Sequence, residues 1–141
     1  MIEFTVHGRP QQKGSKRSIR MPNGRVATVD MNQRARAWQD AVSTAAAEAY
    51  QGELLNGPVK LGVRFCFARP KSHYGTGKNS SILKPSASRH HMKTPDLDKL
   101  LRTLGDALTG IIVRDDSQIA YVVAEKVYAN QDYCAVRIEE L

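Results

Sequence analysis

Four aspartates stand in two close pairs where their side chains could hold a metal ion. Asp96 and Asp98 flank a leucine at the start of a helix-like segment, and Asp115 and Asp116 follow a short apolar stretch. Residues two apart in a helix point about 200° from each other, so the first pair converges only if Asp96 precedes the helix. Carboxylate oxygens suit Mg²⁺ or Mn²⁺ rather than zinc. The pattern predicts a hard-cation site that Asp115 or Asp116 completes.

A purely structural role for the first pair is the alternative. Carboxylates at the start of a helix interact favourably with its dipole, by about 0.3 to 1 kcal/mol. Asp106 lies on the polar side of the same segment and is expected to be structural or to support the site indirectly. The residue types alone leave both interpretations open.

Two helices and four strands are predicted to position these residues. Alternating apolar residues indicate strands at 1–7, 59–67, 119–128 and 133–138, and the last two read as a hairpin through 129–132. Apolar residues at spacings of three and four indicate helices over 31–50 and from Thr94-Pro95 to Gly110. The chain is therefore expected to be a single α+β domain over 1–141, with a largely antiparallel four-stranded sheet packed with two helices.

The second helix has the clearest pattern. Its apolar stripe consists of Leu97, Leu100, Leu101, Leu104 and Leu108. Thr94-Pro95 predicts an N-cap followed by proline in the first turn, and Gly110 predicts the end. Extended geometry at the cap would let Asp96 turn toward the side of Asp98. In the first helix, Trp38 is expected to anchor the core rather than to stack on a base.

Two long basic loops are expected, at 9–30 and 70–94. The chain has 21 Lys and Arg against 14 Asp and Glu, a formal net charge of +7, which favours a polyanionic partner; a merely solvated basic surface is the alternative that charge alone leaves open. A small hairpin around Pro22-Asn23-Gly24 is one possibility in the first loop. The second loop is expected to be exposed and disordered, with surface histidines. The cations expected to contact DNA are Lys13, Lys16, Arg17, Arg20, Lys71, Lys93 and Lys99.

The remaining composition narrows the class of protein. With 41% hydrophobic and 25% charged residues, the chain does not resemble an intrinsically disordered protein. It has neither the roughly 20-residue apolar run of a membrane span nor a signal-peptide pattern, so we expect an intracellular protein without a membrane partner. Cys66 and Cys134 lie in apolar alternating runs and are expected to be buried thiols rather than a disulfide or zinc site.

The segment from Asp96 to Ile119, DLDKLLRTLGDALTGIIVRDDSQI, resembles the signature of RusA-type Holliday junction resolvases, a family frequent in phages and prophages. The family pattern is roughly D-[LIV]-D-N-[LIV]-x-K, then D-A-L, then a short apolar stretch and D-D-x-Q-[VI]. The predicted order of elements also fits, although the first half carries no sharp motif. Lys99 stands where the family has Asn, and Arg102 stands where it has Lys.

The resemblance implies a metal-dependent endodeoxyribonuclease that resolves Holliday junctions or related branched DNA in recombination and repair. It implies Asp96, Asp98 and Asp116 as metal-binding catalytic acids, Asp115 as a possible further ligand, and Mg²⁺, or Mn²⁺, as cofactor. Arg102, one turn beyond Asp98, keeps the cation for a scissile phosphate but cannot donate a proton as lysine can.

The family resemblance also implies a homodimer, and we expect it in the cytoplasm of a bacterial or phage-infected cell. The alternative is a non-catalytic branched-DNA-binding module of a phage replication or packaging system. An endonuclease that prefers flaps or forks is a closer alternative.

Overall fold

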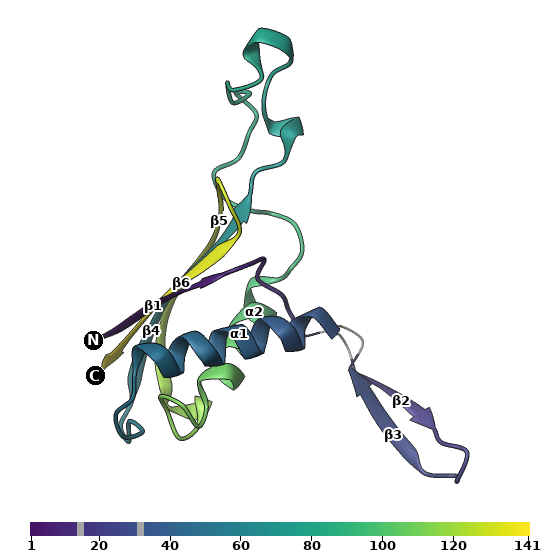
Figure 1. The fold of residues 1–141 in the computed structure, drawn as a ribbon, viewed down its shortest axis with the longest axis vertical. Helices are drawn as coiled ribbons and strands as arrows, with labels where there is room; N and C mark the ends of the chain where they lie inside the picture. Colours follow the sequence, from purple (N-terminus) through teal and green to yellow (C-terminus); the bar gives the residue numbers. More distant parts are fainter. Residues whose placement is uncertain (14–15, 31–32) are drawn as a thin grey trace.

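The computed structural model describes residues 1–13, 16–30 and 33–141. The strands are β1 (Ile2–His7), β2 (Lys16–Arg20), β3 (Val26–Asp30), β4 (Val59–Ala68), β5 (Ile119–Ala129) and β6 (Tyr133–Glu140), and the α-helices are α1 (Gln33–Ala49) and α2 (Leu97–Leu108). Three single-turn helices are η1 (Lys71–His73), η2 (Gly77–Asn79) and η3 (Asp116–Gln118). The two α-helices pack against a four-stranded sheet, which confirms the predicted α+β fold (Figure 1).

The main sheet has the strand order β1-β6-β4-β5. β6 is antiparallel to both of its neighbours, while β4 and β5 are parallel. The sheet is therefore mixed but largely antiparallel, as predicted. The predicted hairpin between the last two strands is wrong, because β6 pairs with β1 and β4 and not with β5.

The connection between β5 and β6 explains this difference. Asp132 accepts a hydrogen bond from the Ala68 amide at 2.8 Å, and the Arg69 amide donates to the Ala129 carbonyl at 3.1 Å. The connection thus crosses the end of β4 and lets the chain return on the other side of that strand. β4 is the most apolar strand, so both later strands gain by pairing with it.

The core lies between the sheet and the two helices. On β4, Val59, Leu61, Val63, Phe65 and Phe67 alternate inward and are buried. Leu100, Leu104 and Leu108 of α2 are fully buried against them, and Trp38 of α1 is 4% exposed, as its predicted role as a core anchor requires. Cys66 and Cys134 are buried free thiols, also as predicted.

Helix α2 begins two residues later than Thr94-Pro95 suggested. Its N-cap is Asp96, which has an extended backbone (φ −78°, ψ 137°), rather than Thr94. The helix ends just before Gly110, whose φ of 84° places it in the left-handed region that glycine favours. Leu97 is the first residue of both the apolar stripe and the helix, so the stripe marks the start of α2 better than Thr94-Pro95 does.

The first basic loop contains a hairpin. β2 and β3 pair with each other in a separate two-stranded sheet that projects away from the main sheet (Figure 1). Of the two alternatives left open by the sequence, the structure contains the hairpin. It joins the rest of the protein through residues 9–13 and α1.

The second basic loop projects from another side of the molecule, but it is not structureless (Figure 1). It contains η1 and η2, and its last residues return to the edge of β5, where the His91 amide donates to the Lys126 carbonyl at 3.0 Å. His91 is only 6% exposed and stacks on Phe67 with ring centroids 4.0 Å apart. The expectation of a surface residue was wrong for His91, because Phe67 offers it an apolar surface.

No α-helix in the described ranges is long and apolar enough to cross a membrane.

Candidate active site on helix α2

The N-terminus of α2 presents two carboxylates. Asp96 precedes the first helical turn, in the extended conformation that a convergent pair requires, and its carboxylate makes no capping hydrogen bond. Its oxygen Oδ2 lies 3.4 Å from the Lys99 ammonium. Asp98 lies in the first turn and is exposed. Among the described residues, the Asp98 carboxylate has neither a hydrogen-bond partner nor an ion-pair partner, so its oxygens are available.

Asp116 lies against the same helix at Gly105. A Cβ atom added to Gly105 would be 3.4 Å from Cβ and 3.8 Å from Oδ2 of Asp116. Positions 98 and 105 are seven residues apart, so they share one side of α2 and are separated by roughly 10 Å of helix rise. The fold therefore brings Asp98 and Asp116 to one side of α2 from two consecutive elements, α2 and η3.

Arg102 lies between Asp98 and Gly105 along that side of the helix. Its side chain is exposed and off the apolar stripe, as expected from its position. No ion pair joins it to Asp98 within the described part of the chain. Because the Arg102 guanidinium has no carboxylate partner among the described residues, it is available to a ligand.

Asp115 has a different role from its neighbour. Its carboxylate accepts a hydrogen bond from the Ser117 amide at 3.1 Å and caps η3. Hydrogen bonding by Ser117 holds the pKa of the Asp115 carboxyl below its usual value. The structure thus commits Asp115 to the turn that carries Asp116.

Gln118 also holds this turn, a role that its sequence position had not suggested. Its side-chain oxygen accepts hydrogen bonds from the amides of Arg114 (2.8 Å) and Asp115 (3.1 Å). Its side-chain nitrogen donates to the carbonyls of Leu55 (2.8 Å) and Gly57 (3.0 Å). One amide side chain therefore ties the Asp115-Asp116 turn to the segment before β4. The signal was present, because Gln118 belongs to the D-D-x-Q pattern.

Lys126 of β5 is a second residue that sequence reasoning missed. Its ammonium donates to the carbonyls of Lys93 (2.7 Å) and Pro95 (2.8 Å), which fixes the segment that leads into Asp96. Partial burial lowers the pKa of Lys126, and the negative charge of Asp96 acts in the opposite direction. The signal lay in the alternation of β5, where Ala124 and Tyr128 pack on the core and Lys126 occupies the inward position between them.

The predicted metal ligands do not form a complete cage. Within the described ranges, no three Asp, Glu, His or Cys side chains converge closely enough to hold a metal ion. Mg²⁺, however, is usually held by one or two carboxylates and keeps several waters. The carboxylates of Asp96, Asp98 and Asp116 are of the hard-oxygen type that Mg²⁺ and Mn²⁺ prefer, and those of Asp98 and Asp116 are exposed. In chemical type, although not as a converged cage, this donor set fits Mg²⁺ or Mn²⁺.

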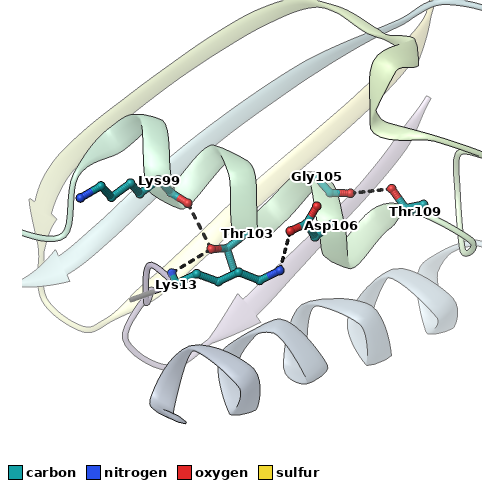
Figure 2. A network of polar contacts seen from close by, with 6 residues as sticks. All are labelled: Lys13, Lys99, Thr103, Gly105, Asp106 and Thr109. Atoms are coloured by element: carbon teal, nitrogen blue, oxygen red, sulfur yellow. Dashed lines mark hydrogen bonds and ion pairs between the residues drawn. The ribbon is translucent and has the colours of Figure 1, made fainter. Parts of the chain in front are cut away.

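The predicted DNA-contacting cations lie in several different surroundings. Arg20, Lys71 and Lys93 are exposed, and Lys99 is the partner of Asp96. The side chains of Lys16 and Arg17 lie outside the described part of the structure. Lys13 is already engaged, because its ammonium lies 2.5 Å from Oδ2 of Asp106 (Figure 2). The carboxylate of Asp106 is thus engaged by Lys13, which agrees with both expectations for it, a structural role or indirect support of the site.

Both basic segments are attached to α2. The loop 70–94 leads directly into Asp96, and the segment that precedes the hairpin is bonded to α2 through Gln12 and Lys13. The loop contains five cations and no acid: Lys71, Lys78, Lys84, Arg89 and Lys93. The available carboxylates therefore lie on α2, in the case of Asp98, or against it, in the case of Asp116, and both basic segments are attached to the same helix.

Two comparisons show which known proteins the chain is similar to. Residues 7–139 match the protein family described as endodeoxyribonuclease RusA. The chain is also similar to YqaN, an uncharacterised protein of Bacillus subtilis (strain 168), with 30% identity over 141 residues that cover 99% of this chain and 96% of that protein. Both matches include α2, η3 and both basic segments.

Proposed function

The chain belongs to the RusA family of endodeoxyribonucleases, and on that premise we propose that it is a divalent-metal-dependent nuclease that cuts branched DNA. The substrate we propose is a Holliday junction or a related branched intermediate, and the reaction is hydrolysis of a phosphodiester. The role is recombination and repair of DNA in the cytoplasm of a bacterial or phage-infected cell. The cofactor we propose is Mg²⁺, which Mn²⁺ can replace.

One observation carries this proposal. The carboxylates of Asp98 and Asp116, which have no partner among the described residues, lie on one side of α2, with the exposed Arg102 between them and with basic segments attached to the same helix. Carboxylates without partners repel phosphate unless a cation lies between them. An acidic site surrounded by cations is therefore suited to a metal ion together with a DNA backbone.

The side chains divide the work of hydrolysis. Asp98, Asp116 and Asp96 would hold the ion, which when bound supplies charge neutralisation and a more acidic water. Arg102 is placed to stabilise the negative charge that grows on the phosphate oxygens. Lys126 keeps the segment before Asp96 in place, and Gln118 together with Asp115 keeps Asp116 against Gly105. The exposed cations of the hairpin and of the loop hold the DNA backbone.

A cleavage assay on a synthetic four-way junction tests the proposal. The wild-type protein should cut the junction when Mg²⁺ is present, stop when EDTA is added, and leave a linear duplex of the same sequence intact. Asp98→Asn or Asp116→Asn should abolish cleavage but leave binding intact or tighter, because each change removes a charge that repels phosphate. Asp96→Asn is expected to behave in the same way.

The assay also separates the alternatives. A wild-type protein that binds the junction and does not cut it with either metal would be the non-catalytic binding module. Faster cleavage of flaps or forks would identify the other branched-DNA nuclease. If the Asn variants lost binding together with cleavage, the acids would be structural, as the helix-dipole interpretation holds. Asp115→Asn should be milder than Asp116→Asn, since its carboxylate already accepts the Ser117 amide.

We also propose that the protein acts as a homodimer. A four-way junction has two-fold symmetry and must be cut twice, and a symmetric dimer presents two equivalent sites. Sedimentation equilibrium, with and without the junction, measures this state directly. A monomer in both conditions would contradict this part of the proposal and leave the nuclease assignment standing.

A further inference from the structure

Residues Gln12 and Lys13 form a strap along α2, just before the basic hairpin. The Gln12 side-chain oxygen accepts the Asp96 amide at 2.6 Å. The Lys13 amide donates to Oγ1 of Thr103 at 3.2 Å, and the Lys13 ammonium pairs with Asp106 (Figure 2). Two adjacent residues thus contact the start and the middle of the same helix.

The helix side of the strap is itself rigidly held. Thr103 is fully buried, and its hydroxyl donates to the Lys99 carbonyl at 3.1 Å while it accepts the Lys13 amide (Figure 2). The side chains of Lys13 and Asp106 are 30% and 33% exposed, so water screens their ion pair less than it screens a pair on the open surface. Lys13 is therefore held to α2 twice, by the hydrogen bond of its backbone amide and by the partly shielded ion pair of its side chain.

The strap lies beside the candidate active site. Lys99, Thr103 and Asp106 follow one another at spacings of four and three and form one side of α2. Asp98, Arg102 and Gly105 have the same spacings one residue earlier, so they form the adjacent side, which Asp116 contacts. A movement of the strap would therefore change the direction from which bound DNA reaches these residues.

We propose that Asp106 is a positioning residue that, through Lys13, holds the basic hairpin in a set direction relative to the acids of α2. The inference rests on the proposed function and deepens it. The hairpin β2–β3 begins three residues after Lys13 and contains Lys16, Arg17, Arg20 and Arg25. Lys13 then serves to hold the hairpin rather than to contact a phosphate.

Charge changes at the two ends of the strap separate this role from a phosphate contact. Asp106→Asn removes a negative charge and Lys13→Met removes a positive one, so direct effects on DNA affinity would have opposite signs. If both residues act through the strap, both variants slow single-turnover cleavage of a bound four-way junction. A group misplaced by an ångström typically costs on the order of 10²-fold in rate, so a loss of at least about tenfold is expected for each.

The double variant and the exchanged pair test the contact itself. Lys13→Met with Asp106→Asn should be no slower than either single variant, because one interaction is lost in all three. Lys13→Glu with Asp106→Lys should regain much of the rate, since opposite charges again face each other. The matched control is Asp40→Asn, which removes the same charge from an exposed position on α1 and should cut at the wild-type rate.

Hydrogen exchange of the DNA-free protein adds a readout that does not need activity. Amides of residues 9–13 and of the hairpin should exchange faster in Asp106→Asn than in wild type, with α1 and β4 unchanged. Equal exchange, a cleavage rate like that of Asp40→Asn, or additive losses in the double variant would each overturn the strap. A wild-type protein that cuts no branched DNA would instead overturn the proposed function, whatever the exchange experiment shows.

Discussion

At the scale of single residues, aspartates near α2 differ in what their oxygens already bind. Asp106 holds Lys13, and Asp115 accepts the Ser117 amide. Asp98 and Asp116 bind no other group among the described residues. An unpartnered carboxylate in a chain of net charge +7 is available for a ligand, whereas a committed one would first lose an interaction that stabilises the fold. Residue type alone does not separate these roles, but the contacts do.

Arg102 can be tested by two substitutions of different size. Arg102→Ala should lower the single-turnover cleavage rate by on the order of 10² to 10³, because a cation at the site contributes where charge develops in the transition state. Arg102→Lys keeps a cation and should retain substantial activity. Binding should change much less than cleavage in both. An Arg102→Ala protein that cuts within about threefold of wild type would contradict the catalytic role and make Arg102 an ordinary exposed residue of the helix.

At the scale of elements, the packing of η3 on α2 depends on the small residue at position 105. A methyl group there would be in ordinary van der Waals contact with Asp116, and a larger side chain would need the same space. Gly105→Ala should therefore leave cleavage intact and raise the free energy of unfolding by up to about 1 kcal/mol, because alanine favours a helix over glycine.

Gly105→Leu is the contrasting change at the same position. It should move Asp116 away from α2 and lower cleavage by on the order of 10²-fold. Circular dichroism and thermal melting will show whether the variant is folded. A folded Gly105→Leu protein with full activity would mean that Asp116 need not lie against the helix.

The burial of His91, at the end of the second basic loop, makes the stability of the protein depend on pH. Burial, and then the nearby charges of Lys126, Arg9 and Lys93, lower the pKa of His91 to about 4, from 6.5 for an exposed histidine. Below pH 6.5 the unfolded chain takes up a proton that the folded protein does not, so stability is lost as the pH falls toward 4. The loss is about 1.4 kcal/mol for each pH unit.

Urea unfolding at pH 7.5 and pH 5.0 checks this prediction. His91→Phe, which keeps a ring on Phe67, should lose about 1 to 2 kcal/mol less than wild type between the two pH values. The difference between the two proteins should then stop growing once the pH is below 4. If wild type and variant lost equal stability, His91 would not be a buried neutral residue.

At the scale of the whole molecule, DNA affinity should depend steeply on salt, because two basic segments project from the fold. Each phosphate contacted should contribute about 0.9 to the slope of log affinity against log salt. Arg20→Glu in β2 should reduce both the affinity and this slope. The matched control, Arg137→Glu, changes the same charge on the sheet face opposite the helices and should have a smaller effect. An affinity that does not depend on salt would contradict the role of the basic segments.

Local sequence patterns predicted the four strands of the main sheet, the two α-helices and the segments that carry the candidate acids. Apolar residues alternate from Val59 to Phe67 and form a leucine stripe on α2, and these patterns indicate which side of each element is buried. Burial of that side stabilises the element. The acids of the D-L-D and D-D-x-Q patterns could also be located, whereas the start of α2 at Leu97, which leaves Asp96 before the helix, was predicted two residues too early. Each of these inferences depends on residues within one or two turns of each other.

The pairing of the strands and of the polar side chains depends on contacts between distant parts of the chain, which local patterns do not reveal. β1, β4 and β5 could each have paired with β6, and no turn signal in the sequence says which of them do. The inner position of β4, between β6 and β5, follows from how deeply the whole fold buries this strand. Lys13 and Asp106 are 93 positions apart, so nothing local marks Lys13 as the partner of a carboxylate rather than of a phosphate. The same holds for Lys126 and for the burial of His91. Charged and aromatic side chains take their roles from what the fold places beside them, because their free energy depends on partners and solvent exposure more than on local sequence.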